Sequence, residues 1–265
     1  MNIRKLSKVI LYDEGTTEKL DFTEIASYVR DTLRSVNVEV KPYPLTPPVS
    51  EDLLSGYAKR FAISKIDDPL KVWTKDEPLY GEVDYEKRRI KSGGTSTGIL
   101  YEGIELQQIF GEMMQSEERN LQFVHIFFTS RLFATFDDAN KRYHARVSIL
   151  GVPSIISITG LVEAPAKPRE FYLLKQQYDT LGKDVTALKD TFKGRFIDYE
   201  DERLTEIIKG YVMQAVFYSL VGNPFCEDSK CRLYNAHWQK EAIFAQVGSE
   251  YEFCQYHADV LNTCS

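Results

Sequence analysis

The chain has 265 residues, of which 43% are hydrophobic, and a formal net charge of −6 at pH 7. This composition excludes a disordered or fibrous protein, and it suits a single domain over residues 1–265. Nucleic acid is disfavoured as a partner, because it normally requires a basic surplus over the whole domain. No stretch approaches the roughly 18 apolar residues of a membrane span, and the start does not resemble a signal peptide, so we expect a cytoplasmic protein without a membrane partner.

The first 43 residues predict a β-α-β unit. The segment KVILY at 8–12 has the apolar run of a strand. Asp21 and Glu24 are spaced as a capping box at the start of a helix that continues to Leu33 with apolar residues at helical intervals. NVEVKPY at 37–43 then predicts a second strand.

The next part of the chain is predicted to be irregular. Four prolines at positions 42, 44, 47 and 48 exclude a helix or a central strand there. Residues 60–104 are expected to form a loop-rich insertion with short strands. The segment SGGTSTG at 92–98 lacks the Gly-x4-Gly-Lys-Ser/Thr spacing of a phosphate loop, so we expect a plain flexible loop.

The central part of the chain predicts one helix followed by strands. ELQQIFGEMMQ at 105–115 is the helix, and the run from 120 to 136 opens with a strand buried on both faces. His125 lies in that strand and is expected to be a packed core residue. Two further strands are expected over 144–151 and 153–165.

The last third of the chain is predicted to be mainly helical. Residues 169–190 have a helical pattern with a break near Gly182. The longest predicted helix is 200–221, with apolar residues at intervals of three and four and acidic residues in its first turn. Gly222 suits the position just after the helix, and Pro224 prevents its continuation.

Two of the four cysteines follow this helix, in the spacing Cys226-x4-Cys231, and a second close pair follows as Cys254-x2-His257. Two close pairs joined by a longer loop are what a tetrahedral zinc site needs, and three thiolates with one imidazole form a closed shell. Cys264 is an alternative to His257 as the fourth ligand, and four unrelated thiols are the other interpretation. A closed shell leaves no position for water, so we expect one structural zinc ion.

The C-terminal region 222–265 resembles that of the archaemetzincins, zinc peptidases of the metzincin group. Their pattern His-Glu-x-x-His-x-x-Gly-x3-Cys-x4-Cys-x-Met is followed later by Cys-x-x-Cys. The matching positions are Gly222, Cys226, Cys231 and Cys254, with His257 where the last cysteine would be. The chain is also similar to an archaeal group of metallopeptidase-like sequences. The resemblance implies an α/β, metzincin-like fold with a twisted sheet, a long active-site-type helix and a zinc-bound C-terminal loop region.

The catalytic part of that pattern is missing. Carrying the register back from Gly222 places the two helical histidines, the general-base glutamate and the third histidine at Ala215, Ser219, Val216 and Phe225, respectively. The methionine of the pattern is replaced by Leu233. A metzincin needs three imidazoles and a carboxylate to activate a zinc-bound water. We therefore expect no catalytic residues and a degenerate peptidase site.

Two functions remain open at this point. The first is a non-catalytic zinc protein that binds an extended peptide or protein segment along a sheet edge. The second is a metal-dependent hydrolase with an unconventional site that uses His125, His144 or His237. A cleft lined by these histidines would favour the hydrolase, whereas a closed apolar patch at the degenerate positions would favour the first function. We expect His237 to begin a helix capped by Asn235.

Overall fold

The computed structural model describes residues 3–15, 17–93, 98–184, 191–192 and 194–264. Its strands are β1 (Lys8–Asp13), β2 (Asn37–Pro42), β3 (Leu100–Glu102), β4 (Phe123–Thr129), β5 (Leu132–Asp137), β6 (Arg142–Arg146), β7 (Ser148–Ile149) and β8 (Ser154–Ser157). Its α-helices are α1 (Phe22–Leu33), α2 (Glu51–Ile63), α3 (Tyr80–Ser92), α4 (Gly103–Met113), α5 (Ile158–Glu163), α6 (Arg169–Thr180), α8 (Leu204–Val221), α9 (Gln239–Ile243) and α10 (Gln255–Cys264). Two short turns are the 3₁₀ turn η1 (Ser116–Glu118) and the π-helical turn η2 (Phe244–Gly248).

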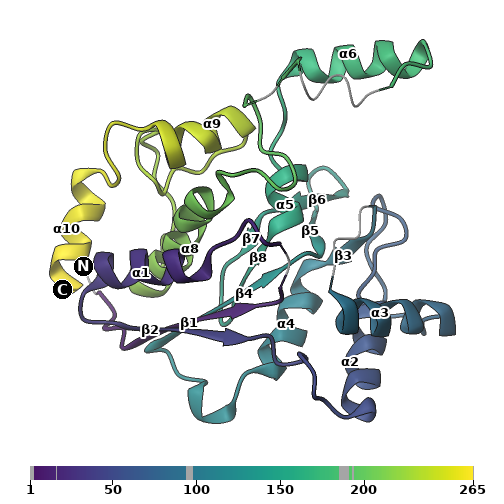
Figure 1. The fold of residues 1–265 in the computed structure, drawn as a ribbon, viewed down its shortest axis with the longest axis horizontal. Helices are drawn as coiled ribbons and strands as arrows, with labels where there is room; N and C mark the ends of the chain where they lie inside the picture. Colours follow the sequence, from purple (N-terminus) through teal and green to yellow (C-terminus); the bar gives the residue numbers. More distant parts are fainter. Residues whose placement is uncertain (1–2, 16, 94–97, 185–190, 193, 265) are drawn as a thin grey trace.

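The strands form two sheets (Figure 1). In the larger sheet the order is β2-β1-β4-β8-β7, with β7 antiparallel to β8 and the other neighbours parallel. The smaller sheet has the order β3-β5-β6, and β6 is antiparallel to β5. Residues 142–149 therefore form an edge of both sheets, because β6 ends one sheet and β7 ends the other.

The predicted β-α-β start is confirmed as β1, α1 and β2. The Asp21 carboxylate caps α1 by accepting from the backbone N–H groups of Thr23 (2.8 Å) and Glu24 (3.0 Å). The predicted buried strand is β4, where His125 is 1% exposed. Its Nδ1 lies 3.1 Å from the Tyr12 hydroxyl and its Nε2 2.9 Å from the Glu118 carbonyl, which confirms it as a satisfied core residue.

Helices cover both faces of the larger sheet (Figure 1). Alternate β1 residues Val9 and Leu11 pack in one hydrophobic cluster with α1 and α8, whereas Ile10 and Tyr12 pack in another with α2 and α4. Helix α8 is buried on nearly all sides, since 15 of its 18 residues are buried. It is therefore a central core helix rather than the one-faced surface helix that its apolar pattern suggests.

The expectation for residues 60–104 is wrong in its secondary structure. Helix α2 continues to Ile63, and α3 adds a helix of 13 residues where short strands and loops were predicted. The buried residues of α3 are Glu86 and Arg89, so the helix has no apolar face that a hydrophobic pattern could reveal. Part of the segment SGGTSTG, residues 94–97, lies outside the described residues. The single-domain organisation stays a prediction.

Two other boundaries differ from the sequence prediction, and a third agrees with it. The strand expected over 153–165 is only β8, because the Ser157 hydroxyl accepts from the Gly160 N–H (2.7 Å) and begins α5. The long helix begins at Leu204 rather than at residue 200. Helix α6 ends at Thr180, before Gly182 at φ 63°, which confirms the expected break, and residues 185–190 lie outside the described part.

Gly222 ends α8 in the left-handed conformation, as predicted. Its φ is 77°, and its N–H donates to the Tyr218 carbonyl (2.9 Å). A Cβ there would meet no atom within 4 Å, so a substitution would be opposed by the backbone conformation alone. We expect Gly222→Ala to lower the free energy of unfolding by about 1 kcal/mol, measured by urea denaturation.

A matched control is Gly56→Ala, in the exposed middle of α2, where a Cβ also meets nothing within 4 Å. Because Gly56 has a helical conformation, that substitution is expected to stabilise the protein by about 0.5–1 kcal/mol. The same side chain should thus have opposite effects at the two positions. Equal effects would mean that the left-handed end of α8 is not required.

In the described part of the chain, no helix combines the length and the apolar character needed to cross a bilayer.

Candidate metal centre and adjoining cleft

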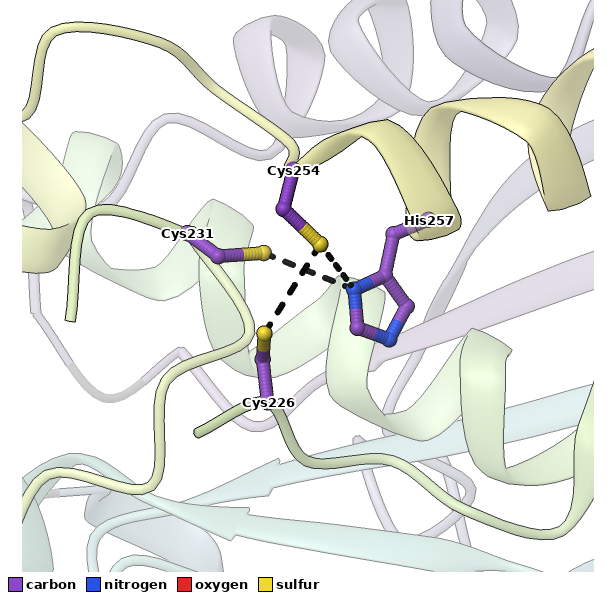
Figure 2. Close-up of side chains that lie close together, drawn as sticks. All are labelled: Cys226, Cys231, Cys254 and His257. Atoms are coloured by element: carbon purple, nitrogen blue, oxygen red, sulfur yellow. Dashed lines mark hydrogen bonds between the residues drawn. The ribbon is translucent and has the colours of Figure 1, made fainter. Parts of the chain in front are cut away.

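Figure 2 shows the side chains of Cys226, Cys231, Cys254 and His257 converging on one point. The two Sγ atoms of Cys226 and Cys254 are 3.8 Å apart, and His257 Nδ1 lies 3.1 Å from Cys254 Sγ and 3.6 Å from Cys231 Sγ. The four ligand atoms all lie within 4.8 Å of one another. Zinc–ligand bonds in a tetrahedral site imply S···S distances of about 3.8 Å and S···N distances of about 3.5 Å. The quartet therefore has the donors and the spacing to hold a metal ion.

Short local structures bring the first pair together. The Cys226 N–H donates to the Leu233 carbonyl (2.9 Å), and the Cys231 N–H donates to the Asp228 carbonyl (3.0 Å). The Asp228 N–H in turn points at Cys226 Sγ (3.4 Å). The loop therefore closes on itself, so both sulfurs of this pair are placed by the backbone of 226–233.

The second pair lies at the start of α10. Cys254 precedes the helix, its carbonyl accepts from the Ala258 N–H (3.0 Å), and His257 follows one turn later. The Arg232 N–H donates to the Glu252 carbonyl (2.8 Å), which ties the two loops together. From α8, the Phe217 ring contacts the His257 ring edge to face, with centroids 5.1 Å apart. The quartet thus joins α8, the first loop and α10.

Burial opposes the ionisation of the thiols and the imidazole of this quartet. Burial raises the pKa of the Cys231 thiol to about 12 and also raises the pKa of Cys226. Burial lowers the pKa of His257, so its imidazole stays neutral and able to coordinate. Since only thiolates ligate zinc, the positive charge of a metal is what would make these buried thiols lose their protons.

The structure favours His257 over Cys264 as the fourth member of the quartet. Cys264 lies at the far end of α10 and outside the group of converging ligand atoms. Across the described residues, this quartet is the only group of three or more His, Cys, Asp or Glu side chains that could hold a metal. That these four residues bind zinc stays a prediction.

A cleft of about 340 Å³ adjoins the cysteine loop. Its lining includes the edge segment 144–148 and, from α8, Tyr211 and Gln214. Ala164, Pro165, Phe225 and residues 234–237 complete the lining. The cleft therefore lies between an open sheet edge and the long central helix.

The positions expected for the lost catalytic residues do not face this cleft. Ala215 and Val216 are 0% exposed and Ser219 is 8% exposed, and only Phe225 lines the cleft. The α8 residues that line the cleft are Tyr211 and Gln214, which are themselves 7% and 3% exposed. The closed apolar patch considered for the degenerate positions is thus found at the buried Ala215 and Val216, whereas Phe225 is 39% exposed. Beside them, Gln214 Nε2 lies 3.5 Å from the Tyr234 carbonyl.

Two of the three candidate histidines, His144 and His237, line the cleft. His144 Nε2 lies 3.5 Å from Asp137 Oδ2. His237 is exposed, and its backbone N–H donates to the Glu241 carboxylate (3.1 Å). Helix α9 begins at Gln239, so the expected cap by Asn235 is wrong. The Glu241 carboxylate, in the first turn of α9, instead accepts from the backbone N–H groups of His237 and Trp238.

The sequence matches one protein family over nearly its whole length. The model of a family described as a probable metallopeptidase family (DUF6775) matches residues 5–264. A solved structure of a zinc-dependent peptidase from Methanocorpusculum labreanum (strain Z) aligns with a TM-score of 0.42 and 13% sequence identity, covering 97% of this chain and 100% of that one. Curated proteins gave no match. Because the family match spans nearly the whole sequence, the chain belongs to this probable metallopeptidase family.

Proposed function

We propose that the protein is a zinc-binding, metzincin-like member of its family that binds an extended peptide in the cleft and does not cleave it. The observation that carries this proposal is the lining of the cleft. Its helical wall offers Tyr211 and Gln214, and the quartet beyond it is the only group among the described residues that could hold a metal. The cleft can thus hold a peptide, but among the described residues no convergent set of metal ligands lines it.

The quartet supports a structural role for the metal. Cys226, Cys231, Cys254 and His257 would supply four protein ligands, and a closed shell of this kind has no open position for a reacting water. Such an ion supplies folding energy, because the ligands are brought together only in the folded chain. The archaemetzincin resemblance, with α8 ending at Gly222 before this loop, supports the finer family assignment.

The sheet edge supports peptide binding. β7 pairs with β8 in the register Ser148↔Ile156, and the Ser157 N–H donates to the Val147 carbonyl (2.7 Å). Bonded and non-bonded pairs alternate along an antiparallel ladder, so the N–H and C=O of Ser148 point away from β8. Both Val147 and Ser148 line the cleft. An extended peptide can therefore add a strand here by backbone hydrogen bonds.

A hydrolase is the second candidate, and one observation favours it. His144 and His237 both line the cleft, and His144 lies beside Asp137, as a base beside an orienting carboxylate does. In this reading either histidine would act as a general base in peptide hydrolysis. His144→Ala and His237→Ala variants would then abolish cleavage, whereas they would leave binding by the sheet edge largely intact.

The test uses protein purified without added zinc. We expect about one zinc per chain by metal analysis, and no peptide cleavage above a control treated with a chelator. Chelator-sensitive cleavage by the unmodified protein would contradict the non-catalytic assignment and support the hydrolase. A second bound metal ion would do the same.

Binding is tested with extended peptides that carry single N-methyl groups on the backbone, which leaves the protein unchanged. Only every second residue of an added strand points its backbone N–H at β7. N-methylation of those residues removes the donor and should weaken binding about tenfold, whereas N-methylation of the residues between them should have little effect. Fluorescence anisotropy gives the affinities. Equal losses at all positions would show that the peptide does not pair with β7.

A further inference from the structure

A second cleft, of about 430 Å³, lies next to the first. Two backbone segments, at Ala166 and at 237–239, separate the clefts. The Ala166 N–H donates to the His237 carbonyl (3.1 Å), and the Gln239 N–H donates to the Ala166 carbonyl (2.9 Å). Pro165 and His237 line the first cleft, and the next residue of each segment, Ala166 or Trp238, lines the second. A bound peptide that extends out of the first cleft across these two segments therefore reaches the second cleft.

The two clefts are basic, although the whole chain carries a net charge of −6. The lining of the second cleft includes Arg169, Arg195 and Lys240, against the single carboxylate of Glu170, which lies 3.5 Å from Arg195. The lining of the first includes Arg146 and no acidic residue. Among the residues that line the two clefts, four cationic side chains therefore stand against one carboxylate.

Most of these cations lack an acidic partner. Among the described residues, no ion pair is formed by Arg146, Arg169 or Lys240, and Arg146 Nε instead donates to the Thr135 hydroxyl (2.9 Å). By contrast, the basic residues Lys8 and Lys41 both pair with Glu118 elsewhere on the surface. The cations at the clefts are thus available to an anionic ligand.

Trp238 supplies an apolar contact between these charges. Its side chain is 42% exposed although it lines the second cleft. A half-exposed indole beside cationic side chains is typical of a binding surface, because it offers a large apolar area together with one N–H donor. The second cleft therefore combines an apolar anchor with positive charge.

We propose that the two clefts together bind an acidic polypeptide segment, with its backbone along β7 and its carboxylates in the second cleft against Arg169, Arg195 and Lys240. This inference rests on the proposed peptide binding in the first cleft. Charge complementarity selects the ligand, because anionic side chains gain from the unpaired cations and the net negative charge of the protein repels acidic chains elsewhere.

The experiment compares two labelled peptides that differ only in having glutamates or glutamines in the half expected to reach the second cleft. In low-salt buffer the glutamate peptide should bind about tenfold more tightly, and the difference should shrink as salt is added. The double variant Arg169→Glu, Lys240→Glu should remove this preference. Arg88→Glu, a single charge reversal on α3 away from both clefts, should leave the preference intact.

Other outcomes contradict the inference in distinguishable ways. If both peptides bind equally well to the unmodified protein, the acidic preference is wrong and the peptide-binding function stands. If neither binds, both proposals are wrong. Tighter binding of a single-stranded oligonucleotide than of the glutamate peptide would show that the clefts take nucleic acid. Thermal melts of each variant confirm that these exposed substitutions leave the fold intact.

Discussion

Replacing Cys231 with serine is expected to lower the melting temperature by about 10 °C or more. Cys231 is completely buried, and its Sγ lies 3.6 Å from His257 Nδ1. Structural zinc sites of this ligand type contribute on the order of 10 kcal/mol to folding, and loss of even about 4 kcal/mol has this effect on a chain of such length. Metal analysis should show that the variant has lost its zinc, and excess chelator should reproduce its melting curve with the unmodified protein.

The matched control is Cys264→Ser, which makes the same chemical change outside the quartet. Because Cys264 is only partly buried, we expect a cost of about 1 kcal/mol or less and unchanged zinc content. Similar losses in the two variants would refute the ligand set. A stable Cys231→Ser protein that keeps its zinc would refute it as well.

The metal quartet could be predicted because its information is local. Each pair lies within a short segment, so Cys226 with Cys231 and Cys254 with His257 converge almost regardless of the rest of the fold. The choice between His257 and Cys264 needed the structure of α10. Within a continuous helix, seven residues separate them by about 10 Å along the axis, so both cannot reach the same centre.

Helix α3 could not be predicted, because the residues it buries are charged. Glu86 and Arg89 face the interior only because Arg131, Tyr101 and Ser130 lie there to receive them. Those partners come from β3 and from the turn after β4, and no spacing within 80–92 reveals them. Apolar periodicity detects helices that bury apolar faces, and it fails for a helix held by a buried ionic network.

The lining of the cleft could not be predicted, for a different reason. The α8 residues that line it, Tyr211 and Gln214, are only 7% and 3% exposed, so they differ little in burial from Ala215 and Val216. Helix α8 is buried on nearly all sides, so its own sequence does not show which side lines the cleft. That side is fixed by residues 144–148, more than 60 positions earlier in the chain.

The second large effect is expected for Arg131→Met. The Arg131 side chain is fully buried, pairs with Glu14 through Nη1 and with Glu86 through Nη2 (3.0 Å), and stacks over the Phe61 ring at 3.9 Å. Burial alone would raise the pKa of Glu86, but Arg131, the Tyr101 hydroxyl and Arg89 lower it below its usual value. Removing the guanidinium leaves buried carboxylates without their main partner, so we expect a loss of about 3–5 kcal/mol in the free energy of unfolding.

A double-mutant cycle separates the ion pair from simple loss of packing. Glu86→Leu alone should also be strongly destabilising, because it leaves Arg131 with one carboxylate fewer in a buried site. The combination Arg131→Met, Glu86→Leu should cost well below the sum of the single changes, because an apolar pair no longer carries an unpaired charge. Arg88→Ala, which removes an exposed i,i+4 pair with Asp84 on the same helix, should cost less than about 0.5 kcal/mol by urea denaturation. Additive losses in the cycle would mean that α3 is held by packing alone, and that its buried charges are not what joins it to β1 and β4.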